Sequence, residues 1–226
     1  MKISSSRSPQ AAVSAETIGT LINLSGRQRM LSQRIVLQML RASRGDPGAI
    51  DIARRCLETF ESAHSDLVTG NESLPGAFSG ALQQLYFGHS RADARIREFI
   101  GQARAAIDAP PADTAWRASS LDALVAQATP ILELLQAVTQ AYQEEMHYCE
   151  IAVRKRQTDL GERLGSISMQ ANIVAMNARV SAARAGEYGR EFSVITQVLA
   201  DIIKEMDQLV RHIHNSGNAS TSAPRH

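Results

Sequence analysis

Apolar residues recur at every third or fourth position along most of this chain, which is the spacing of one face of an α-helix. Near the N-terminus, Ile18, Leu21, Ile22 and Leu31 follow this spacing. The pattern predicts helices over residues 12–43, 47–68, 81–108, 113–128, 130–185 and 192–214. The predicted fold class is therefore all-α.

Turn-forming residues separate the predicted helices. The run Gly45-Asp46-Pro47-Gly48 ends the first helix, and Asp46 and Pro47 suit the N-cap and the first residue of the second. A loop is predicted over 70–80, and Ala109-Pro110-Pro111 stops the third helix. Short connections of this kind join antiparallel neighbours, so the first four helical segments predict a bundle.

The last helix of this bundle is predicted to be long. Thr129 can cap it, Pro130 suits its first turn, and the later glycines Gly161 and Gly165 are isolated. A continuous helix is therefore expected from 130 to about 185.

Two glycines, Gly186 and Gly189, predict a reversal after the long helix. The returning helix is expected to pack along one seam formed by Ile195, Leu199, Ile202, Met206, Leu209 and Ile213. The predicted architecture is an antiparallel four-helix bundle whose last long helix continues into an antiparallel coiled-coil hairpin. The predicted parts are a flexible N-terminus over 1–11, a four-helix domain over 12–157, a hairpin over 158–214 with its tip near 186–189, and a disordered tail over 215–226.

The composition agrees with packed helices and argues against nucleic-acid binding, anionic-membrane binding and a cysteine-based metal or redox site. Apolar residues make up 44% of the 226 residues and aromatic residues only 4%. A net charge of +1 gives no electrostatic footprint for nucleic acid or an anionic membrane. Cys56 and Cys149 are far apart, form no metal or redox spacing and suit a reducing compartment. No cofactor is expected.

The chain is expected to be cytoplasmic. Residues 1–15 are Ser-rich and lack the apolar core of a secretory signal. The most apolar stretch, 121–142, contains Asp122, Pro130 and Glu133, and so falls short of the roughly 20 clean residues of a membrane span.

Arg29 occupies an unusual position in the first helix. Steps of three and four residues place it on a stripe otherwise made of apolar and small side chains: Ile18, Ile22, Ser25, Ser32 and Val36. A charge in such a stripe needs a partner, and no acidic residue lies between Glu16 and Asp46. Either a carboxylate of the long helix, such as Glu133 or Glu144, pairs with Arg29, or an anion binds in fork geometry.

Small residues are concentrated near the predicted hairpin tip and allow other helices to approach closely. They are Ala171, Ala175, Ala178, Ser181, Ala182, Ala183 and Ala185. The segment resembles the cytoplasmic hairpin tip of methyl-accepting chemotaxis receptors. Positions that match that family's block are Asn172, Ala175, Asn177, Ala178, Ala182, Ala183, Arg184, Ala185, Gly186, Glu187, Gly189, Arg190, Phe192 and Val194.

This resemblance implies a docking surface for a chemotaxis histidine kinase, its coupling protein or other receptors. The residues that would form it are Ile173, Met176, Asn177, Arg184 and Val194. Two positions depart from the family: Ser181 replaces a nearly constant Glu, and Glu191 replaces the Gly before Phe192. A hairpin that only stabilises a dimer is the alternative.

The first helix resembles a second family, the amino-terminal domain of type IV pilus methyl-accepting transducers and of nitrate/nitrite sensor kinases. The matching positions are Ile22, Asn23, Ser25, Gly26, Arg29, Met30, either Ser32 or Gln33, and Arg34. The resemblance implies a small oxyanion, nitrate or nitrite, bound by Arg29 and its symmetry mate across a homodimer interface. Ile22, Ser25, Gly26 and Met30 would line that site, with Gly26 leaving room for the ligand. Arg27 and Gln28 vary from the nitrate-sensor form.

Enzyme function is not expected. The chain shows no nucleophile–base pair and no nucleotide motif. Glu61-x-x-His64 and Glu144-x-x-His147 have the spacing of a di-iron carboxylate bundle, but the first helix lacks the carboxylate that such a centre needs. The predicted function is an anion sensor that signals through the hairpin, and the alternative is a ligand-free adapter that docks signalling proteins.

Overall fold

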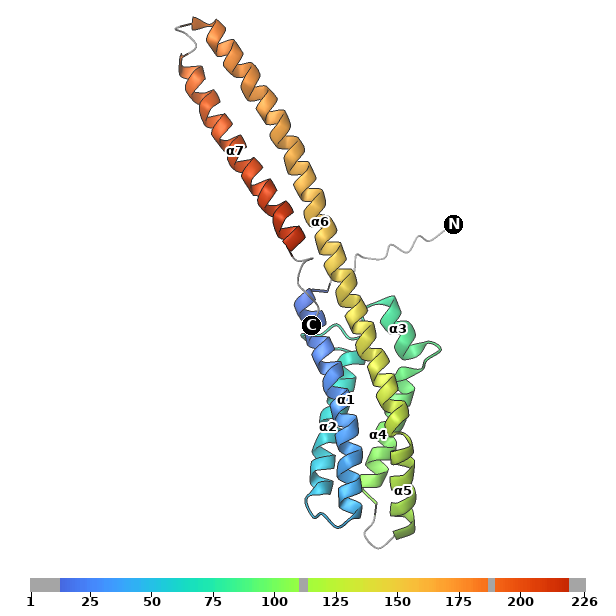
Figure 1. Cartoon of the computed structure of the whole chain (residues 1–226). Coiled ribbons are helices and arrows are strands. Elements are labelled where there is room, and N and C mark those ends of the chain that lie inside the picture. Colours follow the sequence, from blue (N-terminus) through green and yellow to red (C-terminus); the bar gives the residue numbers. More distant parts are fainter. Residues whose placement is uncertain (1–12, 110–113, 187–189, 220–226) are drawn as a thin grey trace, which may run out of the picture. The chain divides into compact units, whose positions relative to one another are not determined.

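The structure is a computed structural model that describes residues 13–109, 114–186 and 190–219. The helices are α1 (Ala15–Ser43), α2 (Ala49–Val68), α3 (Gly80–Phe87), α4 (Ala92–Ile107), α5 (Thr114–Ala126), α6 (Ala128–Arg184) and α7 (Arg190–Ala219) (Figure 1). The described residues contain no strand, and the predicted all-α fold is confirmed. The predicted N-terminal segment 1–11 and tip residues 187–189 lie outside the described residues.

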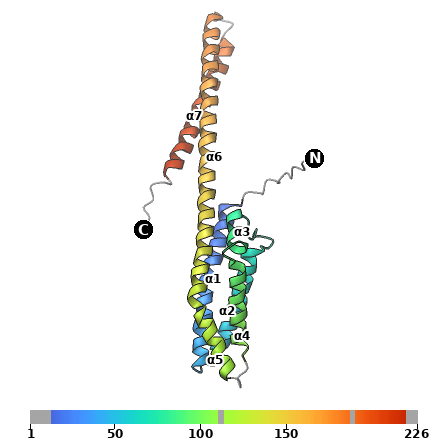
Figure 2. The ribbon, with the colours of Figure 1, turned by 90° about the vertical axis from the view of Figure 1, so that its right-hand side faces the viewer.

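The chain forms two compact units, Met1–Cys149 and Glu150–His226. In the first unit α1, α2 and α4 lie side by side in both views of the ribbon (Figures 1 and 2). The predicted boundary after residue 157 falls within α6, as the boundary of the two units does, and it stays a prediction.

The core of the first unit is formed by large side chains from α1 to α5 and the first turns of α6. Its largest buried members are Tyr86, Tyr142, Phe60, Phe99, Ile18, Leu21, Ile35, Leu67, Leu82, Ile96, Leu124 and Leu135. The rings of Phe60 and Phe99 pack with centroids 5.6 Å apart in a tilted arrangement. Burial of each such side chain contributes about 1.5–3 kcal/mol to the stability of the fold. The Phe60–Phe99 contact therefore helps to hold α2 against α4.

The ends of α1 and α2 have identifiable causes. Ser14 caps α1, because its Oγ accepts a hydrogen bond from the Thr17 N–H at 3.1 Å. The predicted cap of α2 is wrong: Gly48, not Asp46, is its N-cap. Asp46 instead accepts from the Gly48 N–H at 3.3 Å and pairs with Arg41 at 2.5 Å, so its carboxylate closes the turn that precedes the helix.

The single helix predicted over 81–108 is wrong, because the chain breaks between α3 and α4. Gly88 ends α3 with a ψ of −143°, and Arg91 precedes α4 with a φ of +46°. A Cβ on Gly88 would lie 2.5 Å from the Gln84 carbonyl oxygen. This turn therefore requires glycine, although the apolar spacing continues through it.

The loop predicted over 70–80 is confirmed as far as Ser79. Gly70 and Gly76 both have positive φ, of 82° and 67°. A Cβ on Gly76 would lie 2.7 Å from the Thr69 carbonyl carbon. Ser79 then caps α3 through the Leu82 N–H at 3.2 Å, and its hydroxyl donates to Glu145 of α6.

The long helix is confirmed with one correction at its start. α6 begins at Ala128, so Thr129 lies inside its first turn rather than at the cap, and the Ile131 N–H bonds to the Gln127 carbonyl. Pro130 lacks an N–H and fits this turn, where amide hydrogens have no helical partner.

The returning helix is longer than predicted. α7 reaches Ala219 and so includes residues 215–219 of the segment predicted to be disordered, while 220–226 lie outside the described residues. No proline lies between His214 and Pro224, and Ser, Asn and Gly each weaken a helix by about 1 kcal/mol or less. The helix therefore continues past His214.

Among the described residues, one helical run, Ala118–Arg184, is long and apolar enough by composition to cross a membrane. Its most apolar window has a mean hydropathy of 1.3, and 28% of that window is buried. A core helix of a soluble protein passes the same test, and Leu124, Ile131, Leu135 and Val138 of this run are buried in the bundle core. The predicted absence of a membrane span stays a prediction.

Candidate functional site on the first helix and the hairpin

Arg29 lies at the edge of the core-facing side of α1, half-buried. No carboxylate in the described part of the chain forms an ion pair with its guanidinium. The alternative partner Glu144 instead accepts from Gln140 at 3.4 Å. The charge of Arg29 is therefore not neutralised by any described carboxylate of the same chain.

The two serines beside Arg29 face the core. Ser25 and Ser32 are fully buried, and their hydroxyls donate to the carbonyls of Ile22 and Arg29, each at 2.8 Å. This back-bonding uses the only hydrogen of each hydroxyl. Ser25 thus shapes the neighbourhood of Arg29 but has no further hydrogen to donate to a ligand.

The solvent side of the predicted site is open. A Cβ added at Gly26 would meet no heavy atom within 4 Å outside its own helix backbone. Ile22 is half-buried against the core, and Met30, one turn from Gly26, is 52% exposed. The five predicted residues therefore run from the core edge at Ser25 to the surface at Met30, with space at Gly26.

The second unit is a helical hairpin with a seam of small residues. Ala175 and Ala182 of α6 and Thr196 and Ile203 of α7 are buried in it. An arm-to-arm hydrogen bond also joins α6 to α7, from the Arg179 guanidinium to the Gln197 amide oxygen at 2.6 Å. Gly186, with a φ of +59°, begins the reversal.

The prediction that the row with Ile195, Ile202 and Leu209 packs against the other arm of the hairpin is wrong for a single chain. Ile195, Ile202 and Leu209 are at least half exposed, whereas Thr196 and Ile203 face the Ala-rich arm. Small side chains on α6 permit a close approach of the two arms, with Thr196 and Ile203 as the buried residues of α7. The apolar row of α7 consequently points away from α6.

All five residues predicted to contact partners lie on the hairpin surface. Ile173 and Val194 are 57% and 65% exposed, and Met176 is 68% exposed. Asn177 and Arg184 are also exposed, with Arg184 in the last turn of α6. Large apolar side chains exposed this far from a core are typical of a surface that another protein covers.

Two protein families match the chain, one in its N-terminal part and one in its C-terminal part. Residues 12–114 match the type IV pili methyl-accepting chemotaxis transducer N-terminal family. Residues 137–223 match the methyl-accepting chemotaxis protein signalling domain. The chain therefore joins a segment of the transducer N-terminal family to a methyl-accepting chemotaxis signalling segment. Both predicted resemblances are confirmed.

The curated relatives that match part of the chain are methyl-accepting chemotaxis proteins. Methyl-accepting chemotaxis protein TlpA of Bacillus subtilis (strain 168) is 40% identical over 76 residues, which are 29% of this chain and 12% of the relative. TlpB and McpA of the same organism are each 39% identical, over 66 and 70 residues, or 26% and 28% of this chain and 10% and 11% of theirs. The chain thus spans about a tenth of the length of these relatives. No solved structure matches the chain.

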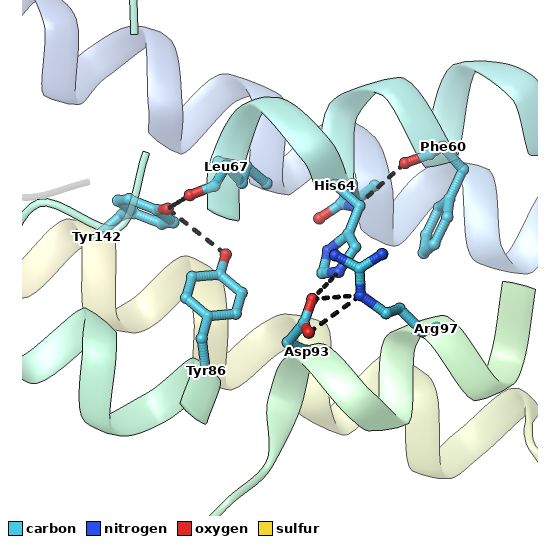
Figure 3. A network of polar contacts seen from close by, with 8 residues as sticks. Phe60, His64, Leu67, Tyr86, Asp93, Arg97 and Tyr142 are labelled. Atoms are coloured by element: carbon cyan, nitrogen blue, oxygen red, sulfur yellow. Dashed lines mark hydrogen bonds and ion pairs between the residues drawn. The ribbon is translucent and has the colours of Figure 1, made fainter. Parts of the chain in front are cut away.

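The transducer segment also contains a buried polar cluster that the sequence did not predict (Figure 3). His64 of α2 is 2% exposed, and its Nε2 lies 2.8 Å from Asp93 Oδ1 of α4. Arg97 donates from its Nε to both oxygens of Asp93, at 2.9 and 3.0 Å. The break at Gly88 permits this contact, because it starts a new helix with Asp93 in its first turn.

The electrostatics of the cluster favour a neutral imidazole and an ionised carboxyl. Burial lowers the pKa of His64, opposed by its bond to Asp93 and assisted by the charge of Arg97. Burial would raise the pKa of Asp93, but the hydrogen bonds from Arg97 and His64 outweigh it and lower that pKa. Asp93 is therefore a fixed acceptor near neutral pH.

Two buried phenols extend the cluster. Tyr142 donates to the Leu67 carbonyl at 3.1 Å, and its oxygen lies 3.5 Å from that of Tyr86 (Figure 3). Burial raises the pKa of Tyr142 to about 12 and raises the pKa of Tyr86 further. Both phenols stay protonated at physiological pH and hold α6 to the end of α2.

The Glu-x-x-His spacings have ordinary structural partners. Glu61 pairs with Arg104 at 2.5 Å, and His64 bonds to Asp93. Among the described residues, no group of three His, Cys, Asp or Glu side chains comes close enough to hold a metal ion.

Proposed function

We propose that this chain is a cytoplasmic, homodimeric, non-enzymatic chemotaxis sensor that binds nitrate or nitrite through Arg29. The observation that carries the proposal is the half-buried Arg29 guanidinium, which has no carboxylate partner in the described chain and lies beside the open space at Gly26. A planar oxyanion matches the fork of donors on a guanidinium. Two copies of α1 would then share one anion between paired arginines.

The signalling half of the proposal follows from the chemotaxis segment. α6 is one helix from Ala128 to Arg184, so it begins in the first compact unit and continues into the second, within the region that matches the signalling domain. Anion binding would relieve repulsion between the two Arg29 side chains and favour one packing of α1 over another. The size of the response is limited by the difference in affinity between the two packings.

Isothermal titration with nitrate and nitrite, with chloride as a control, tests the ligand. We expect saturable binding with about one anion per two chains, and at least about tenfold weaker binding in Arg29→Ala. Arg34→Ala is the matched control, since it removes an exposed arginine from the same helix and should leave the affinity unchanged. Equal binding by the parent and Arg29→Ala would refute the site.

The second candidate is an adapter that docks signalling proteins without a small ligand. The exposed Ile173, Met176 and Asn177 favour it, since an adapter needs only this surface. In a pull-down with purified chemotaxis kinase and coupling protein, Asn177→Trp should abolish capture. Gln157→Trp, an exposed position elsewhere on α6, should not. Capture that persists in Arg29→Ala, without any anion heat, would favour the adapter over the sensor.

A further inference from the structure

Charges of opposite sign are separated onto two helices of the first unit. Between Glu16 and Asp46, α1 and its C-cap contain five arginines and no acidic residue. From Ala128 to Val153, α6 contains four glutamates and no lysine or arginine. Such a separation gives each helix a surface that attracts the other type of helix.

These two helices are neighbours in the bundle and run in opposite directions (Figure 1). Toward one end of α1, the Gln33 amide donates to the Ala128 carbonyl at 3.1 Å. Toward the other end, a Cβ added at Gly19 would lie 3.7 Å from Met146 Cε. The two contacts fix which residues of α1 and α6 lie at the same level along the bundle.

The contact at Ala128 places Glu133 at the level of Arg27. Both helices rise by about 1.5 Å per residue. Glu133, five residues after Ala128, is therefore level with the position five residues before Gln33, which directly follows Arg27. Arg34 is level with the start of α6, which has no carboxylate within a turn. Arg27 is thus the arginine of this surface that has an acidic residue at its own level.

Neither Arg27 nor Glu133 has an ionic partner in its own chain. Both side chains are exposed, and neither forms an ion pair in the described part of the chain. Met30 lies one turn after Arg27 and Leu37 two turns further, and both are about half exposed. The face formed by α1 and α6 therefore combines an unpaired cation, an unpaired anion and apolar side chains.

A second copy of the chain is the partner that matches both charges at once. With the α1/α6 face as the interface, a two-fold axis along the bundle places α1 of one copy against α6 of the other, at unchanged levels. A two-fold axis across the bundle would place α1 against α1, with arginines against arginines, which is unfavourable. The charges therefore select the axis along the bundle.

We propose that Arg27 of each copy pairs with Glu133 of the partner subunit across this face, and that the partner also covers Met30 and Leu37. This pairing depends on the homodimer proposed above and adds the residues that hold it together. The two pairs are equivalent by symmetry. The same axis brings both copies of Arg29 to one level, as a shared anion requires.

The pairs act more on the choice of partner than on the strength of binding. An exposed ion pair adds little affinity, because water solvates both charges well in its absence. Like charges at the same place weaken association strongly. Reversal of a charge is therefore a sharper test of the pairing than its removal.

The test is the dimer dissociation constant of the full chain in analytical ultracentrifugation. Arg27→Glu alone and Glu133→Arg alone each put two like-charge contacts into a dimer, so we expect the dissociation constant to rise by at least about tenfold. An equal mixture of the two variants should restore dimers, because in the mixed dimer both contacts join opposite charges. Only a pair between chains responds to mixing in this way.

Two substitutions on α2 are the matched controls. Arg55→Glu and Glu58→Arg make the same charge reversals at exposed positions outside the α1/α6 face. Each should leave the dissociation constant unchanged, alone and in the mixture. Circular dichroism of every variant checks that the helix content equals that of the parent.

The outcomes distinguish this pairing from the homodimer itself. Weak single variants whose mixture dimerises support the pairing. Single variants that dimerise like the parent overturn it and leave the homodimer standing, and so do weak variants whose mixture stays weak. A parent chain that is monomeric overturns the homodimer, and the pairing with it. Nitrate is absent from these measurements, so the anion site is tested separately.

Discussion

At the scale of single residues, this chain depends on a few positions where only one side chain is compatible with the backbone. Gly70 and Gly76 pack backbone against backbone in the loop between α2 and α3, both with positive φ. Gly88 has a different role, since its contact with Gln84 ends α3 and starts the turn toward Asp93. These three glycines fix the connection on which the α2–α4 contact depends.

Gly76→Ala should therefore be costly. The new Cβ would lie 2.7 Å from the Thr69 carbonyl carbon, and alanine is strained at a φ of 67°. We expect a loss of about 1–3 kcal/mol in the free energy of unfolding, measured by urea denaturation. Gly80→Ala, at the start of α3 with nothing within 4 Å, should be neutral or slightly stabilising. Equal effects of the two substitutions would contradict this account of the loop.

At the scale of elements, the hairpin is held by small residues rather than by large ones. Ala175 and Ala182 are buried where α6 meets α7, while Ile195 and Ile202 of α7 point away. A close-packed seam of this kind tolerates loss of volume better than gain, because both backbones would have to separate to admit a larger side chain.

Ala182→Leu should accordingly destabilise the hairpin by about 1–3 kcal/mol. Ala183→Leu is its matched control, because Ala183 is the next residue of the same helix and is exposed. Amide hydrogen exchange along α6 and α7 measures the effect directly, with faster exchange expected only in Ala182→Leu. Unchanged protection there would show that the two arms do not pack through this seam.

The sequence was sufficient for features encoded locally. Helical spacing gave α1, α2 and α6 within a few residues, and surface positions such as Met176 were predicted from family register. It failed where distant residues decide the outcome. The helix break at Gly88 is hidden because Leu82, Leu85 and Ile96 keep a helical spacing across it. The His64–Asp93 contact joins residues 29 positions apart, which periodicity does not reveal.

At the scale of the whole molecule, each unit leaves an apolar face uncovered by its own chain. On α1, Met30 and Leu37 are 52% and 54% exposed and lie two turns apart on one side. On α7, Ile195, Val198 and Ile202 form an exposed row. Contiguous apolar surface of this kind favours association with another protein surface, and in the proposed homodimer the second copy would cover the face on α1.

The double substitution Met30→Glu/Leu37→Glu should shift the chain toward monomer. Burying two carboxylates in an apolar contact is strongly unfavourable, so the dimer dissociation constant should rise by at least about tenfold in analytical ultracentrifugation. Phe87→Glu, which alters an equally exposed apolar residue on α3, should leave the dissociation constant unchanged. A dimer that is indifferent to the α1 changes would place the interface elsewhere.

At Gly26 the stability of the helix and the proposed anion site favour different residues. Glycine in the middle of a helix costs about 0.5–1 kcal/mol relative to alanine, and here a methyl group would meet no neighbouring atom. Packing therefore gives no reason for the missing methyl. α1 is weaker at this turn than its surroundings demand, and the only gain is an empty volume beside a guanidinium. A Gly26→Ala substitution would therefore stabilise α1 and, at the same time, fill that volume.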